Sequence, residues 1–268
     1  MMAGRPTLTV EHVSVRYGAI RALADVSVTA RAGRVIALLG PNAAGKSTLL
    51  RTSIGAQKAS AGRVLLHGAD VCGLRARDRA ARIAYVPQRS HVAAAFTVQQ
   101  VISLGRYALA PDPDRIVDAL ERLELGSLAD RPYASLSVGQ QQRVTLARAI
   151  AQLAPEGLLV LDEPLSGMDP AHVRRAMSIL LDLAAGGATV IIAMHDITLA
   201  AGVADEAWVL RDGRVHAAGD VEDVLTPERL EAVFDAPFDW HACDGRRVPL
   251  PRPPRRRASA GNASPEEL

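Results

Sequence analysis

Hydrophobic and polar residues are spaced in two ways along the chain, and this spacing outlines its elements. Apolar and polar residues alternate in Leu8–Arg16 and Val26–Ala30, which indicates two half-buried antiparallel strands separated by a break at Tyr17. Apolar runs typical of buried parallel strands follow at Arg34–Leu39 and Thr189–Met194, each after a polar first residue, and at Leu158–Leu161. The pattern therefore predicts an α/β protein that opens with an antiparallel unit.

Helical spacing begins at Thr97. Val98–Leu104 and Asp114–Leu123 are amphipathic with a helical period, and Val144–Leu153 continues in the same way. These segments predict a helical subdomain over about residues 92–156, inserted into the sheet. The remaining expected elements are strands at Gly62–His67 and Arg82–Pro87, a hairpin of Glu206–Arg211 with Arg214–Ala218, and short helices at Val221–Leu225 and Pro227–Phe234.

The loop after Leu39 carries the strongest chemical signal. It reads Gly40, Pro41, Asn42, Ala43, Ala44, Gly45, Lys46, Ser47 and Thr48, which matches the phosphate-binding pattern G-x-x-x-x-G-K-[ST]. Backbone N–H groups and the helix dipole favour an anion at such a strand-to-helix turn. With a nucleoside triphosphate, Lys46 would contact the phosphates and Ser47 would offer its hydroxyl to Mg²⁺. The alternative is a glycine-rich turn with a solvated lysine, although Lys46 is one of only two lysines in the chain.

Two carboxylates follow the apolar run Leu158–Leu161. A buried strand holds carboxylates only at its end, so we expect Asp162 and Glu163 to face a site. Asp162 suits a Mg²⁺ shell, and Glu163 suits orienting or deprotonating a water for attack on a γ-phosphate. A turn with two solvated acids is the alternative.

Three further side chains stand where predicted strands end. Tyr17 offers a face for stacking on a nucleobase, or it packs on its own sheet as an edge tyrosine. Gln88 is placed to contact Mg²⁺ or the attacking water, or it is a surface glutamine. His195 is placed to hydrogen-bond a γ-phosphate, or it is a strand-end histidine without such a role.

A second anion site is predicted where a helix runs into Val144–Leu153. Ser137 and Gly139 stand at its N-terminus, where backbone N–H groups lack intrahelical partners. An ordinary serine cap is the alternative.

Composition narrows the class of protein. The 268 residues are 49% hydrophobic but only 3% aromatic, so we expect an aliphatic core. A formal net charge of +2 does not by itself point to a nucleic-acid partner, because several of the arginines crowd into the last twenty residues. Cys72 and Cys243 stand far apart, which favours a reduced, cytosolic setting. The sequence has neither an apolar leader nor a run of the ~20 apolar residues that a membrane span needs.

The end of the chain changes in composition. From Pro249 it is rich in Pro and Arg, and then in Ser, Ala, Gly and Asn, which predicts a disordered tail over residues 249–268. Contact of this tail with anionic lipid is an option.

The order and spacing of these signals resemble the ATP-binding cassette of ABC transporters over nearly the whole chain before the tail, residues 1–248. The resemblance implies a P-loop NTPase (RecA-like) core with an antiparallel β subdomain and an inserted α-helical subdomain. It makes Tyr17 the adenine-stacking aromatic and Gln88 the Q-loop. It also implies a Walker A loop at Gly40–Thr48 and a signature at Leu136–Gln140, in which Ser137, Gly139 and Gln140 bind nucleotide. Asp162 would be the Walker B carboxylate and Glu163 the catalytic carboxylate. A D-loop at Ser166–Asp169 and a switch histidine at His195 complete the set.

Two segments refine this resemblance. Phe96–Tyr107 and Gly219–Leu230 are similar to the corresponding segments of importers of metal chelates such as ferric siderophores, haem and cobalamin, although cassettes for zinc or other small solutes share much of them.

Two residues depart from the family pattern. Ala43 stands where glycine is usual, and Val138 stands where the signature usually reads Leu-Ser-Gly-Gly-Gln. If position 43 needs a positive φ, alanine costs about 1 kcal/mol there. A β-branched residue at 138 stiffens the backbone beside a partner's γ-phosphate and would slow turnover.

Together these features imply an ATP-hydrolysing subunit that uses ATP and Mg²⁺, with Ser47, Gln88 and Asp162 around the metal and with Lys46, Gln88, Glu163 and His195 in catalysis. The resemblance implies a head-to-tail homodimer or paired cassette. It would be cytoplasmic, on the inner face of the cell membrane, bound to permease subunits and served indirectly by an external solute-binding protein, without nucleic acid. One rival is a degenerate cassette that binds ATP and regulates a partner. Another is an ABC protein of DNA repair or translation. Against it stand the single cassette, the lack of a long coiled-coil insertion and the importer-like middle segment.

Overall fold

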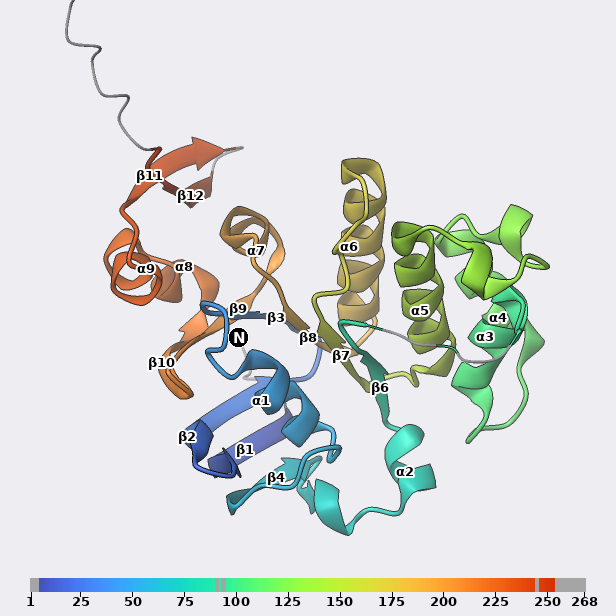
Figure 1. Cartoon of the computed structure of the whole chain (residues 1–268), viewed down its shortest axis with the longest axis horizontal. Coiled ribbons are helices and arrows are strands. Elements are labelled where there is room, and N and C mark those ends of the chain that lie inside the picture. Colours follow the sequence, from blue (N-terminus) through green and yellow to red (C-terminus); the bar gives the residue numbers. More distant parts are fainter. Residues whose placement is uncertain (1–4, 90–91, 93–94, 244–245, 254–268) are drawn as a thin grey trace, which may run out of the picture.

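The computed structural model describes residues 5–89, 92, 95–243 and 246–253, and within them the chain forms three β-sheets. The largest has six strands in the order β10-β9-β3-β8-β7-β6 (Figure 1). Its strands are β3 (Val35–Leu39), β6 (Ile83–Val86), β7 (Leu158–Asp162), β8 (Thr189–Ala193), β9 (Glu206–Arg211) and β10 (Arg214–Asp220). Neighbouring strands run parallel except β9 and β10, which form the predicted hairpin.

The second sheet is the predicted antiparallel unit. Its order is β2-β1-β4-β5, formed by β1 (Pro6–Tyr17), β2 (Ile20–Arg31), β4 (Ala61–Leu66) and β5 (Ala69–Asp70). Both β1 and β2 are longer than the alternating pattern indicated. Register shifts around Val13 interrupt the alternation of side chains between the two faces. The alternating pattern in the sequence is therefore shorter than the strands.

Two hydrophobic cores lie on opposite faces of the six-stranded sheet. Along β3, Val35, Ala37 and Leu39 belong to one core, whereas Ile36 and Leu38 belong to the other. A parallel strand covered on both faces is apolar at every position, which explains its uninterrupted hydrophobic run. The side chains of β1, β2 and α1 pack in the second core, and the long helices pack in the first.

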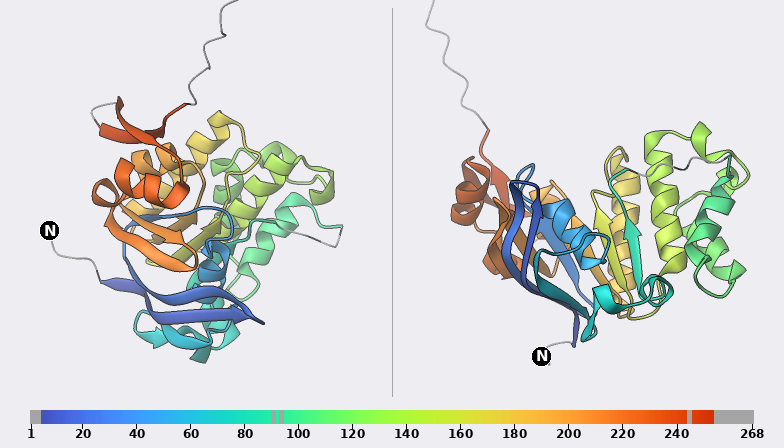
Figure 2. Two further views of the ribbon diagram at one scale, coloured as in Figure 1. Left: turned by 60° about the vertical axis from the view of Figure 1, so that its left-hand side comes forward. Right: turned by 60° about the horizontal axis from the view of Figure 1, so that its bottom comes forward.

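The helices occupy distinct parts of the molecule. Figures 1 and 2 show α3, α4 and α5 gathered at one end, and α8 and α9 near the other. The helix bounds are α1 (Lys46–Ser53), α2 (Ala76–Ala80), α3 (Val98–Ser103), α4 (Pro113–Arg122), α5 (Val138–Gln152), α6 (Pro170–Ala185), α7 (Ile197–Val203), α8 (Val221–Val224) and α9 (Pro227–Phe234). No helix of the described ranges combines the length and the apolar character needed to cross a bilayer.

The C-terminal strands correct one prediction. β11 (Phe238–Cys243) and β12 (Arg246–Pro251) form a two-stranded antiparallel ribbon that the sequence pattern did not predict. The expectation of a disordered tail from Pro249 is therefore wrong for Pro249–Pro251. Proline is tolerated there because a strand in a two-stranded ribbon has an open edge. Residues 254–268 of the expected tail lie outside the described residues.

Candidate nucleotide-binding site

Four parallel strands of the large sheet end at one edge, and a predicted site residue follows each of them. β3 leads into Gly40–Thr48, β6 is followed by Gln88, β7 ends at Asp162 before Glu163, and β8 is followed by His195. Carboxyl ends of adjacent parallel strands meet at the same edge, and ligands of α/β proteins bind there. Residues that are more than a hundred positions apart in sequence are therefore neighbours.

The loop Gly40–Thr48 encloses the N-terminus of α1. Gly45 is the N-cap residue with a φ of 102°, and a Cβ atom at this position would lie 2.7 Å from the Ala22 carbonyl oxygen. Only glycine fits both constraints. Within the described residues, no side chain caps α1, so its first N–H groups are available to an anion.

The Lys46 side chain is folded back over this loop. Its Nζ donates to the carbonyl oxygens of Gly40 at 2.7 Å and Pro41 at 3.1 Å, and the residue is only 6% exposed. Burial lowers the pKa of Lys46, and the negative charges of Glu163 and Asp162 oppose that shift. The amine is thus turned toward the loop rather than toward solvent.

Ala43 has a left-handed backbone conformation, with a φ of 63°. Position 43 therefore does need a positive φ, so alanine carries a strain of about 1 kcal/mol there that glycine would avoid. Ala43 is exposed, and the neighbouring Ala44 donates its N–H to the Pro41 carbonyl oxygen at 3.2 Å. The loop keeps its shape despite the missing glycine.

Ser47 and Asp162 come together from different elements. Ser47 Oγ donates to Asp162 Oδ1 at 3.1 Å, and Asp162 is only 1% exposed. Its second oxygen, Oδ2, is buried without a hydrogen-bond partner among the described residues. Burial raises the pKa of Asp162, as does the nearby charge of Glu163, whereas the hydrogen bond from Ser47 lowers it. A buried carboxylate oxygen that lacks a partner beside a hydroxyl is a donor set that suits a hard cation.

This donor set is incomplete by itself. Within the described part of the chain, no group of three or more His, Cys, Asp and Glu residues is placed to hold a metal ion. Mg²⁺ is commonly bound by one or two protein groups together with substrate phosphates and water. The residues present therefore fit a magnesium ion that arrives with a nucleotide.

Glu163 is held by two side chains. Gln88 Nε2 donates to Glu163 Oε2 at 2.8 Å, and His195 Nε2 pairs with Glu163 Oε1. Glu163 itself has a φ of 53°, and its N–H donates to the Ala193 carbonyl oxygen at 3.1 Å. The three side chains form one cluster at the ends of β6, β7 and β8.

Tyr17 lies at the end of β1 with 44% of its surface exposed. Its hydroxyl donates to Gln57 Oε1 at 3.0 Å, which ties the aromatic ring to the segment that follows α1. Sequence reasoning missed Gln57, because it is 40 positions from Tyr17 and no local pattern links the two residues.

Ser137, Gly139 and Gln140 are not brought to the phosphate loop within one chain. They belong to the start of α5, which packs in the core on the opposite face of the sheet from α1 (Figure 1). Ser137 Oγ accepts the Gln140 N–H at 3.3 Å, and Gln140 Oε1 accepts the Ser137 N–H at 3.0 Å. In the single chain, the serine therefore forms a capping box.

The start of α5 touches the loop after Glu163. A Cβ atom on Gly139 would lie 2.4 Å from the Gly167 carbonyl oxygen, so this contact requires glycine. Val138, beside it, is 68% exposed, and its Cγ1 would lie 3.3 Å from a Cβ atom on Gly167. The unusual valine thus presents an apolar surface next to Ser137.

Comparison with known proteins identifies the family. Residues 23–166, more than half of the chain, match the model of the ABC transporter family, and the chain belongs to that family. The Hemin import ATP-binding protein HmuV of Pseudomonas entomophila is 40% identical over 234 residues, which cover 85% of this chain and 92% of the relative. The Cobalamin import ATP-binding protein BtuD of Halobacterium salinarum is 44% identical over 237 residues, 86% of this chain. The match covers 59% of that relative, so the chain spans about three fifths of its length.

The fold is that of an ATP-binding cassette. The dimeric structure of a bacterial ABC transporter cassette superposes with a TM-score of 0.73 and 26% sequence identity, over 80% of this chain and 98% of that chain. The predicted family and the predicted fold class are confirmed. The names of the two relatives fall within the predicted group of haem and cobalamin importers.

Proposed function

We propose that this chain is the ATP-hydrolysing subunit of an ABC importer whose solute is a metal chelate of the haem, cobalamin or siderophore type. The convergence of Lys46, Ser47 and Asp162 with the Glu163 cluster at one sheet edge carries the proposal. The names of the two relatives support the class of solute. This chain would not contact the solute, which permease subunits and an external solute-binding protein would bind.

Each side chain of the cluster has a task in hydrolysis. The Lys46 ammonium stabilises the negative charge that develops on the transferred γ-phosphoryl group. Ser47 and Asp162 would hold Mg²⁺, with the Gln88 amide nearby, and the ion when bound neutralises charge on the phosphate oxygens. Glu163 orients the attacking water and accepts its proton, while His195 and Gln88 fix the direction of the carboxylate.

The site is completed by a second copy of the chain. Because α5, which Ser137 caps, and the phosphate loop with α1 pack on opposite faces of the sheet, one chain does not bring both to one nucleotide. In a head-to-tail pair, the exposed start of α5 of one copy faces the nucleotide on the other. Ser137 and Gly139 would then direct hydroxyl and N–H groups at the γ-phosphate, after the capping box with Gln140 has opened. The dimeric cassette of the same fold supports this arrangement.

The pair would work on the cytoplasmic side of the cell membrane, bound to permease subunits. ATP binding closes the pair, hydrolysis reopens it, and the permease follows this cycle.

The two lysines of the chain allow a matched test of nucleotide binding. Lys46→Ala should lower ATP affinity in calorimetry by at least about tenfold, since it removes a charge that contacts phosphate. Lys58→Ala removes the same charge from an exposed position and should bind ATP like the unchanged chain. Unchanged ATP affinity in Lys46→Ala, or an equal loss in both variants, would overturn the assignment of the loop.

A second candidate function is favoured by Val138 and Ala43. The strained Ala43 and the bulky Val138 lie on the two surfaces that would meet ATP in the pair. A cassette slowed in this way would bind ATP and regulate its partner without efficient turnover. Phosphate release by the purified complex separates the two functions, because the regulator would bind ATP yet release phosphate at background rates.

A further inference from the structure

A cluster of charged side chains joins the end of α4 to the start of α6, outside the residues assigned to ATP. His172 lies at its centre, with Nδ1 2.6 Å from Asp169 Oδ2 and Nε2 3.7 Å from Glu124 Oε2. Asp169 also caps α6 by accepting the His172 N–H at 3.0 Å. These hydrogen bonds, from the backbone and then the ring of His172, lower the pKa of Asp169. One imidazole therefore contacts carboxylates from two elements.

Two arginines hold the same end of α4. Arg175 Nη1 lies 2.9 Å from Glu124 Oε1, and Arg175 Nε donates to the Arg122 carbonyl oxygen at 2.6 Å. From α5, the buried Arg143 donates to the Leu123 carbonyl oxygen at 2.9 Å. The carboxyl end of α4 is thus fixed by side chains of both α5 and α6.

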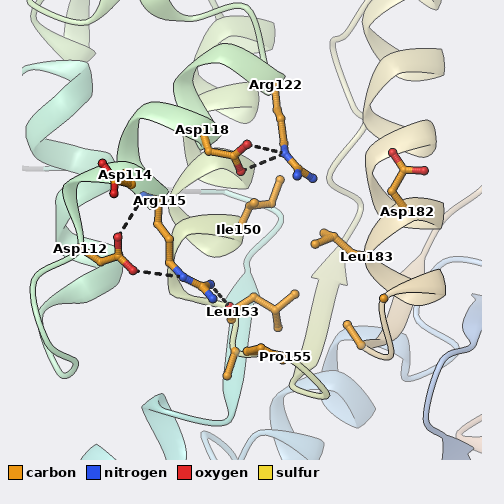
Figure 3. A pocket seen from close by; sticks show the side chains of 13 residues that line it. Asp112, Asp114, Arg115, Asp118, Arg122, Ile150, Leu153, Pro155, Asp182 and Leu183 are labelled. Carbon is orange, nitrogen blue, oxygen red and sulfur yellow. Dashed lines mark hydrogen bonds and ion pairs between the residues drawn. The ribbon is translucent and has the colours of Figure 1, made fainter.

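Next to the cluster, α4 and α6 are separated by a cavity of about 700 Å³. Figure 3 shows Asp118 and Arg122 paired on α4, with Asp182 and Leu183 of α6 across the space. Along this space the two helices do not touch directly, and both pack in the core that they share with α5. The polar contacts at Glu124 and Arg122 link α4 directly to α6.

Asp169 is the last residue of the loop that begins at Glu163. Within this loop the Ser166 N–H donates to the Glu163 carbonyl oxygen at 3.4 Å, which forms a compact turn. The middle of the loop, at Gly167, touches Gly139 of α5. The loop therefore carries Glu163 at its start, contacts the start of α5 at its middle and is fixed through His172 at its end.

We propose that His172 is a positioning residue that couples the end of α4, at Glu124, to the Glu163–Asp169 loop. An imidazole suits this task because its two ring nitrogens point in different directions and can each face a carboxylate. Through Asp169, His172 would set the position of Glu163 and of the loop surface that contacts Gly139. Its effect on turnover rests on the proposed ATPase function, whereas the coupling itself is a property of the single chain.

Hydrogen exchange of the nucleotide-free chain tests the coupling directly. Glu124→Gln should raise exchange about threefold or more in residues 164–172, and His172→Ala should do the same in residues 121–126, although each substitution lies in the other segment. Glu121→Gln, a charge removal at an exposed position of the same helix, should leave residues 164–172 unchanged. Changes confined to the substituted segment, or equal changes with Glu121→Gln, would overturn the proposal.

Steady-state kinetics distinguishes positioning from general destabilisation. His172→Ala and Glu124→Gln should each lower kcat about threefold to tenfold with KM for ATP unchanged, and the double variant should be no slower than the slower single variant. Multiplied effects in the double variant, or a raised KM at constant kcat, would contradict the coupling. If the unchanged chain hydrolyses no ATP, the proposed function fails, and hydrogen exchange alone decides the inference.

Discussion

The Glu163 carboxylate is paired through Oε1 with Nε2 of His195, although the two residues follow different strands. The other carboxylate oxygen accepts a hydrogen bond from Gln88 at 2.8 Å, so neither oxygen is left to rotate freely. The positive φ of Glu163, 53°, turns the chain sharply where β7 ends. Three neighbouring strand ends therefore determine the direction in which this carboxylate would receive a proton from water.

Replacing Glu163 tests that role. Glu163→Gln should lower steady-state phosphate release by about a hundredfold or more, because glutamine keeps the size of the side chain but does not accept a proton. ATP affinity should stay within about threefold, since Lys46 and the loop are untouched. Gel filtration with ATP should show a long-lived dimer of this variant. Turnover as fast as that of the unchanged chain would remove Glu163 from its proposed role.

Asp162 is expected to lower the stability of the nucleotide-free chain and to be needed for binding Mg²⁺. Asp162→Asn should raise the free energy of unfolding of the nucleotide-free chain by about 1 kcal/mol, because it replaces a buried charge with a neutral amide that still accepts from Ser47. The same variant should lose the thermal stabilisation that Mg·ATP gives the unchanged chain. A variant less stable than the unchanged chain without nucleotide would contradict this expectation.

The pH dependence of stability provides a separate check on Asp162. Burial raises its pKa in the folded chain, so between the unfolded value of about 3.9 and the higher folded value the folded state binds more protons than the unfolded state. The contribution of Asp162 to stability therefore decreases as pH rises through this window. The advantage of Asp162→Asn in denaturant unfolding should grow over the same window, and an advantage that shrinks with rising pH would contradict the assignment.

Val138 is expected to limit turnover. Its branched side chain is 68% exposed beside Ser137, where the second copy would present ATP. Val138→Gly should increase phosphate release at saturating Mg·ATP by about threefold, because the loss of β-branching frees the backbone there. Val138→Ala should release phosphate at an intermediate rate, because alanine removes the branched side chain but keeps a Cβ atom that restricts the backbone. Slower release by Val138→Gly would show that the chain has adapted to its valine.

Ala43 is expected to strain the phosphate loop. Ala43→Gly should raise the free energy of unfolding by about 0.5 kcal/mol, since relief of a left-handed alanine exceeds the added flexibility of the unfolded chain. Ala44→Gly is a suitable control, because Ala44 is buried in the second core and has no positive φ. This variant should be less stable than the unchanged chain. Denaturant unfolding measures both variants, and loss of stability in Ala43→Gly would exclude strain at this position.

Much of the fold was predictable because its signals are local. The apolar runs within Arg34–Leu39 and Thr189–Met194 reflect strands covered on both faces, and these strands lie where the pattern placed them. The ribbon of β11 and β12 was missed, because the prolines of Pro249–Pro251 are typical of unstructured chain and only pairing with Phe238–Cys243 makes them a strand.

The sequence by itself determined which chemical groups stand at the strand ends, because motif residues such as Lys46 and Asp162 are tied to their neighbours in the chain. Only the tertiary structure decided which groups touch. The pairing of Glu163 with His195, of Tyr17 with Gln57 and of His172 with Glu124 depends on strand order and on helix packing. Such contacts join residues that are distant in sequence, and no local spacing encodes the distance between them.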